Sequence, residues 1–160
     1  MSPDPAAASP RRAEPPVGQG AEPFWDATRR RQLRLPWCTA CQRFFFYPRL
    51  FCPTCLGDTV EWRDAAGTGV VYAYTVEHRA ETAAFADGSP YVVALVELAE
   101  GVRLMANIVG CDPAQVRIDL PVTVCWEPLS DGRHLPLFTP RVDGAGTAAP
   151  TRPPAEESSL

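Results

Sequence analysis

Two cysteine pairs with the same spacing constrain this chain more than any other feature. Cys38 and Cys41 are separated by two residues, ten residues follow, and Cys52 and Cys55 repeat the two-residue gap. Each pair can form a tight turn that presents two thiolates to one ion, and two turns complete the tetrahedron that zinc prefers in structural sites. We therefore predict that these four cysteines bind one zinc ion. Iron is the alternative metal, because four thiolates suit both.

The predicted metal is structural, because four thiolates fill its coordination sphere and leave no position for water or a substrate. It takes the place of a hydrophobic core in a segment of about 25 residues, which is too small to fold alone. The sequence shows neither the apolar stretch of a secretory signal nor one long enough to span a bilayer. We therefore expect a cytoplasmic protein without membrane association, in which cysteines bind metal rather than form disulfides.

The charged residues of the chain exclude or disfavour several classes of function. The formal net charge of −4 argues against a general nucleic-acid binder, since such proteins need excess basic charge to neutralise phosphates. All 15 basic residues are arginine. A chain without lysine cannot form a lysine Schiff base, and arginine does not deprotonate to act as a base.

The composition divides the chain into an ordered centre and two tails. Residues 1–23 and 142–160 are rich in small residues and proline and have no periodic apolar pattern, so both are predicted to be disordered. Residues 24–35 are predicted to form an N-terminal helix that Pro36 ends, and residues 36–60 are predicted to form the zinc ribbon. Residues 61–141 follow as a β domain.

The β domain is predicted from short apolar runs that are rich in β-branched and aromatic residues and separated by turn signals. Asp112 and Pro113 begin one predicted helical turn. Five or six short strands with one short helix between them suggest a small Greek-key barrel, so the fold class is mostly β. The predicted strands include Val70–Val76, Tyr91–Leu98, Val102–Val109, Val122–Trp126 and Leu135–Phe138.

No self-sufficient catalytic site is recognisable, so no residue is predicted to be catalytic. The residue types of a catalytic triad occur at Ser130, Asp131 and His134. A turn is the better interpretation, because a triad is defined by geometry and no G-x-S-x-G elbow surrounds Ser130. Cys111 and Cys125 stand apart from the zinc cluster and are expected to be small buried hydrophobes, with a reactive thiol as the alternative.

An arginine cluster and an aromatic run form the candidate contact surface. Six arginines fall within 21 residues that contain no acidic residue, and four consecutive aromatics lie between the cysteine pairs. Arginine binds phosphates in a bidentate manner, and some of the aromatic side chains are expected to face a partner or an acyl chain. A solvated basic face and packing of the ribbon onto the barrel are the alternatives. The candidate CoA or partner contacts are Arg29, Arg30, Arg31, Arg34, Arg43, Phe44, Phe45, Phe46, Tyr47 and Arg49.

A series of short motifs covers about residues 24–140. It runs through Phe24-Trp25, Leu33, Cys38-x2-Cys41, Pro48-Arg49, Cys52-Pro53-x-Cys55, Glu61-Trp62, Gly67-x-Gly69 and Val71-Tyr72-x-Tyr74-Thr75-Val76. In this order the motifs resemble the zinc-ribbon and OB-fold proteins that accompany thiolases, a family long grouped as a domain of unknown function. The resemblance implies an N-terminal helix, a rubredoxin-like zinc ribbon and a five- to six-stranded OB-fold barrel.

The resemblance also implies a role. Members of this family are non-catalytic accessory subunits of thiolase-like acyl-CoA enzymes, such as steroid side-chain retro-aldolases and C-acyltransferases. In such complexes the partner carries the catalytic residues, and the small protein stabilises the complex and shapes the acyl-CoA site. Acyl-CoA is therefore a candidate shared ligand. One position departs from the family, which usually has glycine where this chain has Asp119, and we expect the aspartate to change that turn.

Two other functions remain open. OB barrels often bind single-stranded nucleic acid, and the local arginine cluster favours such a role although the net charge argues against it. A free-standing enzyme that uses Cys111, Cys125 or His78 is the third hypothesis, and it lacks a recognisable pair of base and nucleophile.

Overall fold

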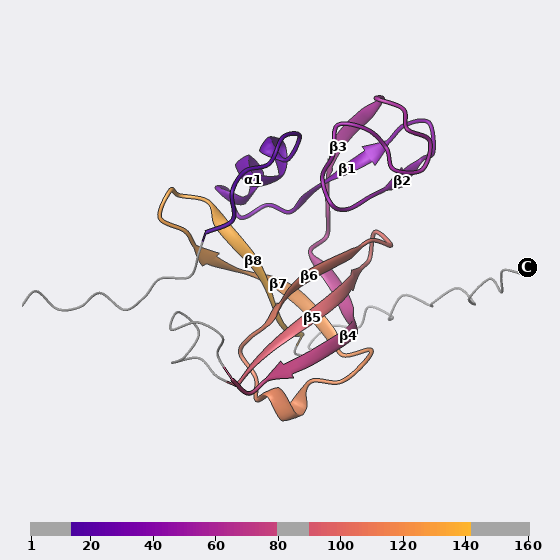
Figure 1. Cartoon of the computed structure of the whole chain (residues 1–160). Coiled ribbons are helices and arrows are strands. Elements are labelled where there is room, and N and C mark those ends of the chain that lie inside the picture. Colours follow the sequence, from indigo (N-terminus) through magenta and orange to yellow (C-terminus); the bar gives the residue numbers. More distant parts are fainter. Residues whose placement is uncertain (1–13, 80–89, 142–160) are drawn as a thin grey trace, which may run out of the picture.

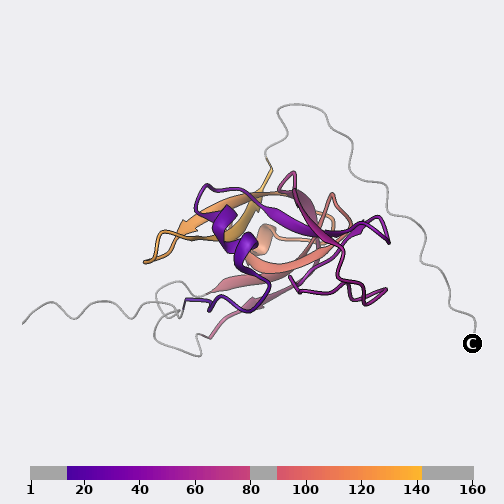
Figure 2. The same ribbon diagram turned by 90° about the horizontal axis from the view of Figure 1, so that it is seen from above.

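A three-stranded sheet carries the cysteines, and it lies beside a short helix on one side of a closed barrel (Figure 1). This computed structural model describes residues 14–79 and 90–141. Seen from above, the helix and the sheet overlie the barrel (Figure 2). The mostly β fold class is confirmed. Within the described residues, no helix has the length and apolar character needed to cross a membrane.

The predicted N-terminal tail is partly ordered. Ala21 is fully buried, the backbone and hydroxyl of Ser130 both donate to the Glu14 carboxylate, and Arg133 donates to the carbonyl of Pro15. These contacts with a distant turn give residues 14–23 the partners that their composition does not reveal, so the prediction of disorder is wrong there. The predicted disorder of residues 1–13 and 142–160 lies outside the described residues.

The helix α1 (Glu22–Thr28) is shorter than the predicted range of 24–35. It buries one face, formed by Phe24, Trp25, Ala27 and Thr28. The prediction is wrong beyond Thr28, because Arg31 takes a left-handed backbone with φ of 56°, which ends the helix. The strand β1 then begins at Arg34, since its pairing with β3 outweighs helix propensity.

The ribbon sheet has the order β2-β1-β3, and both pairings are antiparallel. Its strands are β1 (Arg34–Cys38), β2 (Arg43–Phe44) and β3 (Val60–Asp64). β3 pairs with β1 from Val60 to Asp64, so the sheet extends beyond the predicted range of 36–60 at both ends.

The barrel is a closed sheet in the order β4-β5-β6-β8-β7, with β7 returning to β4. All its pairings are antiparallel except β6 with β8. Five strands separated by one short helical turn match the predicted OB-fold barrel. The elements are β4 (Thr68–Glu77), β5 (Tyr91–Leu98), β6 (Arg103–Ile108), η1 (Pro113–Gln115), β7 (Pro121–Pro128) and β8 (His134–Pro140).

The core fills the barrel and continues under the helix. Alternate residues of β5 point inward, and Phe138 of β8 is fully buried among them. Phe24 and Trp25 of α1 join the same cluster, so the helix closes one end of the barrel core. Asp119 has a left-handed φ of 62° and donates its N–H to the Val71 carbonyl. The turn therefore has the conformation that favours glycine, and aspartate tolerates it better than most residues.

Candidate functional site

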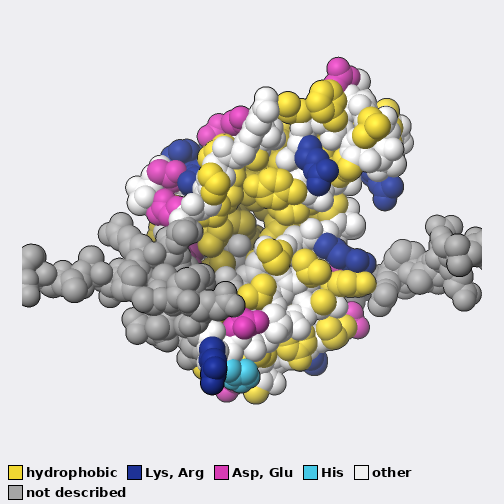
Figure 3. Space-filling model, viewed as in Figure 1, with side chains coloured by type: hydrophobic (Ala, Val, Ile, Leu, Met, Phe, Trp, Pro, Cys, Tyr) yellow, Lys and Arg dark blue, Asp and Glu magenta, His cyan; other side chains and the backbone are white. Residues whose placement is uncertain are grey.

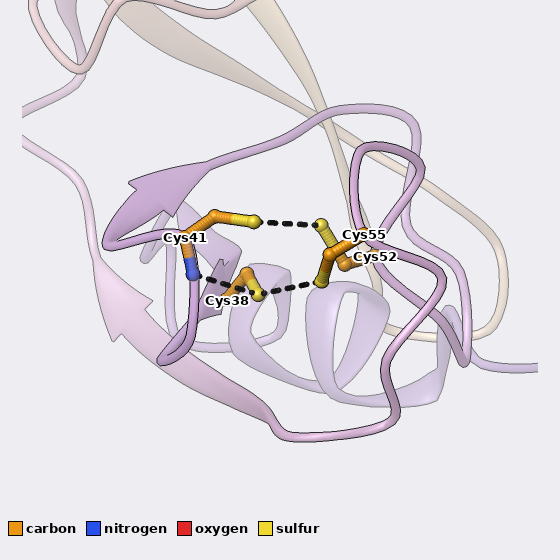
Figure 4. A group of neighbouring side chains, drawn as sticks. All are labelled: Cys38, Cys41, Cys52 and Cys55. Carbon is orange, nitrogen blue, oxygen red and sulfur yellow. Dashed lines mark hydrogen bonds between the residues drawn. The ribbon is translucent and has the colours of Figure 1, made fainter.

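The four predicted ligands meet at one end of the ribbon. Cys38 ends β1 and Cys41 lies in the turn before β2, while Cys52 and Cys55 lie in the loop before β3. All four sulfur atoms lie within 4.8 Å of one another. Figure 4 shows that they pair across the two turns, Cys38 with Cys55 at 3.6 Å and Cys41 with Cys52 at 3.9 Å.

The two turns resemble each other locally, and we call them the first knuckle (residues 38–42) and the second knuckle (residues 52–56). In each, a backbone N–H donates to the sulfur of the first cysteine at 3.4 Å, from Cys41 in one and from Thr54 in the other. The residue after the second cysteine is left-handed in both, with φ of 49° at Gln42 and 59° at Leu56. The left-handed residue thus recurs with the cysteine spacing, whereas the N–H donor follows the first cysteine by three residues in one knuckle and by two in the other.

The sulfur cluster fits a structural zinc ion. Zinc–sulfur bonds of about 2.3 Å in a tetrahedron place sulfurs about 3.8 Å apart, and the two measured cross-knuckle distances lie on either side of that value. Hydrogen bonding to Cys55 raises the pKa of Cys41 to about 12, whereas the Cys55 backbone lowers the pKa of Cys52 to about 6. One cation among the sulfurs would let all four ionise. Bound there, zinc supplies a cross-link and has no open position for chemistry.

The predicted arginines fall into two groups. Arg29 forms an ion pair with Asp26 at 3.8 Å, and Arg34 forms one with Asp64 at 2.8 Å. The positive charges of these two arginines are therefore balanced by carboxylates of the same chain. The other four lie on the exposed surface, and no ion pair joins them to a described carboxylate; they are Arg30, Arg31, Arg43 and Arg49.

The aromatic run mostly packs inside the molecule. Phe45 is buried against the cysteine cluster, and Phe44 lies edge-on to a tryptophan of β1 with 4.7 Å between ring centroids. Phe46 contacts Phe24 of α1, with 5.9 Å between ring centroids. Tyr47 is exposed. Phe44 and Phe46 therefore pack against the main core, Phe45 packs within the ribbon, and Tyr47 is the most exposed of the four.

A hollow of about 380 Å³ separates the ribbon from the β5–β6 hairpin. Arg43 and Phe44 line it from the ribbon, and Arg103 and Glu97 line it from the barrel. Arg103 pairs with Glu97 at 2.9 Å and lies over the ring of Tyr72, 3.4 Å from its centroid. Figure 3 shows the molecule hollowed between its two parts, with arginine side chains on both sides. The sequence gives no signal for Arg103, because only the fold brings it opposite the ribbon.

Two family models together match most of the described chain. The zinc ribbon domain of ChsH2, described as rubredoxin-like, matches residues 25–61, and the C-terminal OB-fold domain of ChsH2 matches residues 62–127. A chain of the solved "Ltp2-ChsH2(DUF35) aldolase" is similar with 38% identity and a TM-score of 0.72, over 81% of this chain and 100% of that chain. This chain belongs to the DUF35 family.

Two further relatives of this DUF35 chain carry different names. A "probable enoyl-CoA hydratase alpha subunit" of Thermomonospora curvata is 44% identical over 123 residues, which are 74% of this chain and 37% of the relative. A "DUF35 domain-containing scaffold protein" of Methanocaldococcus jannaschii is 36% identical over 95 residues, 59% of this chain and 67% of the relative. This chain thus spans little more than a third of the length of the hydratase subunit.

The triad-like residues of this DUF35 chain do not form a triad. The Ser130 hydroxyl donates to Glu14, and Asp131 pairs with Arg133. The Nδ1 atom of His134 lies 3.0 Å from the carbonyl oxygen of Thr28. Ser130 and His134 therefore fasten the β7–β8 turn to the N-terminal segment and to α1, while the Asp131 side chain stays within the turn.

The two cysteines outside the zinc cluster are half-buried. Burial raises the pKa of both Cys111 and Cys125, and a neighbouring acidic residue raises each further. Because the thiolate is the reactive form, these shifts lower their reactivity at neutral pH. His78 lies just beyond β4.

Proposed function

We propose that this chain is a non-catalytic accessory subunit of a thiolase-like acyl-CoA enzyme that makes or breaks a C–C bond, such as a steroid side-chain retro-aldolase or a C-acyltransferase. The observation that carries the proposal is the match to the whole DUF35 chain of the Ltp2–ChsH2 aldolase. The aldolase is named for two proteins, Ltp2 and ChsH2, and this chain matches one of its chains over that chain's whole length. This supports a role as one of two kinds of subunit in such an enzyme. A metal site made of four cysteine thiolates favours a cytoplasmic location, where thiols stay reduced.

The hollow between ribbon and barrel is the proposed acyl-CoA contact. Arg43 lines it without a described acidic partner, so its guanidinium is available for a phosphate. Phe44 and Phe46 add apolar surface beside that charge. Arg103 is engaged by Glu97 and Tyr72, so we assign the phosphate contact to Arg43 and a supporting role to Arg103.

Catalysis is assigned to the partner. The described histidine and serine side chains at the β7–β8 turn are engaged in contacts that hold the fold, and the pKa values of Cys111 and Cys125 are raised. A nucleophile needs a nearby base or a lowered pKa. These environments offer neither, which supports a partner that supplies the reacting groups.

Reconstitution with Ltp2 of the solved aldolase tests the subunit role. The zinc-loaded chain is mixed with purified Ltp2, and the mass of the mixture is measured by light scattering after size-exclusion chromatography. We expect a stable heteromeric complex, and aldolase activity only in the mixture. Turnover of an acyl-CoA by the chain alone, or separate elution of the two proteins, contradicts the proposal.

Ligand binding separates the acyl-CoA role from the nucleic-acid alternative. We expect CoA to bind the complex, and Arg43→Ala to weaken this binding about tenfold through loss of one charge-assisted phosphate contact. Arg63→Ala is the matched control, because Arg63 is an exposed ribbon arginine that already pairs with Glu61. Tighter binding of a single-stranded oligonucleotide than of CoA, with steep salt dependence, would favour the OB-fold nucleic-acid binder instead.

A further inference from the structure

Leu56 combines two unusual properties at one position of the second knuckle. Its backbone is left-handed with φ of 59°, a conformation that favours glycine, and its side chain is 77% exposed, more than any other large hydrophobic side chain described. Gln42 occupies the equivalent position of the first knuckle with the same backbone and a polar side chain. The fold alone therefore gives no reason for a large apolar residue at Leu56.

The loop around Leu56 is the most apolar exposed segment described. Four of the nine exposed large hydrophobic residues lie within residues 47–56, so the apolar surface is concentrated there. Besides Leu56 they are Tyr47, Leu50 and Phe51. Leu50 also packs against Gly20, which ties the loop to the N-terminal segment. Figure 3 shows hydrophobic and arginine side chains together on the ribbon. We call residues 47–56 the ribbon loop.

The positive charge in and beside the ribbon loop is not neutralised by a described carboxylate. Arg43 and Arg49 are exposed and make no ion pair with a described carboxylate. Residues 27–57 contain six arginines and no acidic residue. An apolar knob with basic neighbours complements an apolar pocket with an acidic rim.

The other exposed apolar face offers no such selectivity. Met105 of β6 is 70% exposed and lies between two shallow hollows on the barrel wall. The charged pair next to it on the strand pair β5–β6, Arg103 with Glu97, is already neutralised. No charged residue lines either hollow, so this face offers less to select a partner, and the ribbon loop is the better docking surface.

We propose that the ribbon loop docks on the enzyme subunit, with Leu56 inserted into an apolar pocket that has an acidic rim facing Arg49. This inference rests on the proposed function, because it names the surface by which the accessory subunit holds its partner. Docking would also cover Cys55, the one exposed cysteine of the zinc cluster. Partner binding and zinc retention are then linked.

Replacement by glycine gives a test that does not damage the fold. Leu56→Gly removes the knob while giving the left-handed position its preferred residue, and Gln42→Gly makes the same backbone change without removing an apolar side chain. Affinity for Ltp2 is measured by titration calorimetry with zinc-loaded chains of equal zinc content. We expect Leu56→Gly to weaken binding at least tenfold, Arg49→Glu to weaken it as well, and Gln42→Gly to bind as the wild type does.

The outcomes separate the two levels of the proposal. If the wild-type chain does not bind Ltp2, the subunit role and the docking surface both fail. If the wild type binds but Leu56→Gly binds equally well, only the docking surface fails. The same conclusion follows if Met105→Glu abolishes binding while Leu56→Gly does not. A slower release of zinc to a chelator in the complex than in the free chain is the second expected result, and equal rates contradict the coverage of Cys55.

Discussion

The zinc ribbon and the OB barrel are stabilised in different ways. The buried cluster of the ribbon has three residues, two of which are cysteines, so it offers almost no apolar core of its own. The cluster that fills the barrel and continues under α1 contains 17 buried residues, one of which is Leu35 at the start of the ribbon strand β1. A core of that size can be stabilised by burial of apolar surface, whereas the ribbon depends on a metal cross-link. The barrel is thus stabilised mainly by its hydrophobic core, and the cysteine end of the ribbon mainly by the bound metal.

The two parts also differ in charge. Residues 27–57 carry six arginines and no acidic residue, for a formal charge of +6. Since the whole chain carries −4, the remaining residues carry −4 − 6 = −10. The ribbon segment therefore attracts anionic groups that the rest of the chain repels, and this contrast places both proposed contacts on the ribbon side.

Loss of the metal should produce the largest difference between the two parts. Structural zinc contributes about 10–16 kcal/mol in zinc-finger peptides, so we expect Cys38→Ser to lose its zinc and to unfold the ribbon while the barrel stays folded. Zinc content by mass spectrometry and amide hydrogen exchange along the chain measure both effects. Cys125→Ser is the control and should keep one zinc per chain. Full zinc content in Cys38→Ser, with protected amides in β1–β3, would contradict a structural site.

A cavity in the barrel core should have the opposite effect, weakening the barrel and leaving the metal site of the ribbon intact. Phe138 is fully buried, and Phe138→Ala should destabilise the barrel by about 3–5 kcal/mol. We expect urea unfolding at lower concentration and unchanged zinc content. Ile118→Ala, at a half-exposed position, should change stability by less than about 0.5 kcal/mol. Simultaneous loss of zinc and barrel structure in Phe138→Ala would show that the two parts unfold as one unit. That result would contradict the view that ribbon and barrel are stabilised separately.

The contact between the N-terminal segment and the barrel should depend on pH. The pKa of Asp131 is lowered chiefly by the backbone N–H of Arg133, and the Arg133 side chain adds to the shift. Because the folded pKa lies below the unfolded value, the carboxylate stabilises the fold at neutral pH, and this contribution is lost as the pH falls through the lowered pKa. Melting temperatures between pH 2 and pH 7 should therefore separate wild type from Asp131→Asn at neutral pH and converge in acid. A constant difference across the range contradicts this assignment.

The smallest expected effect concerns the left-handed turn before β7. Asp119→Gly removes a side chain from a left-handed position, a gain of up to about 1 kcal/mol that the greater freedom of glycine in the unfolded chain partly offsets. We expect a slight rise in the midpoint of urea unfolding. Asp119→Ala keeps the Cβ atom and should show no rise. A clear loss of stability in Asp119→Gly would mean that the aspartate side chain makes a stabilising contact.

Local patterns revealed much of the fold. The paired spacing of the four cysteines is enough to predict the metal cluster, because each knuckle is a short turn whose ligands are close in sequence. The alternation of apolar residues in β5 matches the predicted strand at both ends, Tyr91 and Leu98. The capped turn at Asp112 also follows from local chemistry, since its side chain accepts the N–H of Ala114.

These local patterns could not predict contacts between residues that are far apart in the sequence. The predicted helix continued through residues that instead enter β1, because the pairing of Arg34 with Asp64 in the sheet is invisible to local propensity. Residues 14–16 look disordered by composition and are held by Arg133, which is 5% exposed and stacks on Trp25.

The sequence by itself determined the zinc ribbon, the barrel strands and the family, because these depend on spacing and periodicity along the chain. The tertiary structure decided which aromatic and basic side chains remain available. It buried Phe45 against the cysteines, turned Phe46 to α1, placed Arg103 opposite Arg43 and left Leu56 exposed. The reason is physical: exposure and charge compensation depend on which side chains meet across the fold, and those neighbours are set only when ribbon, helix and barrel pack together.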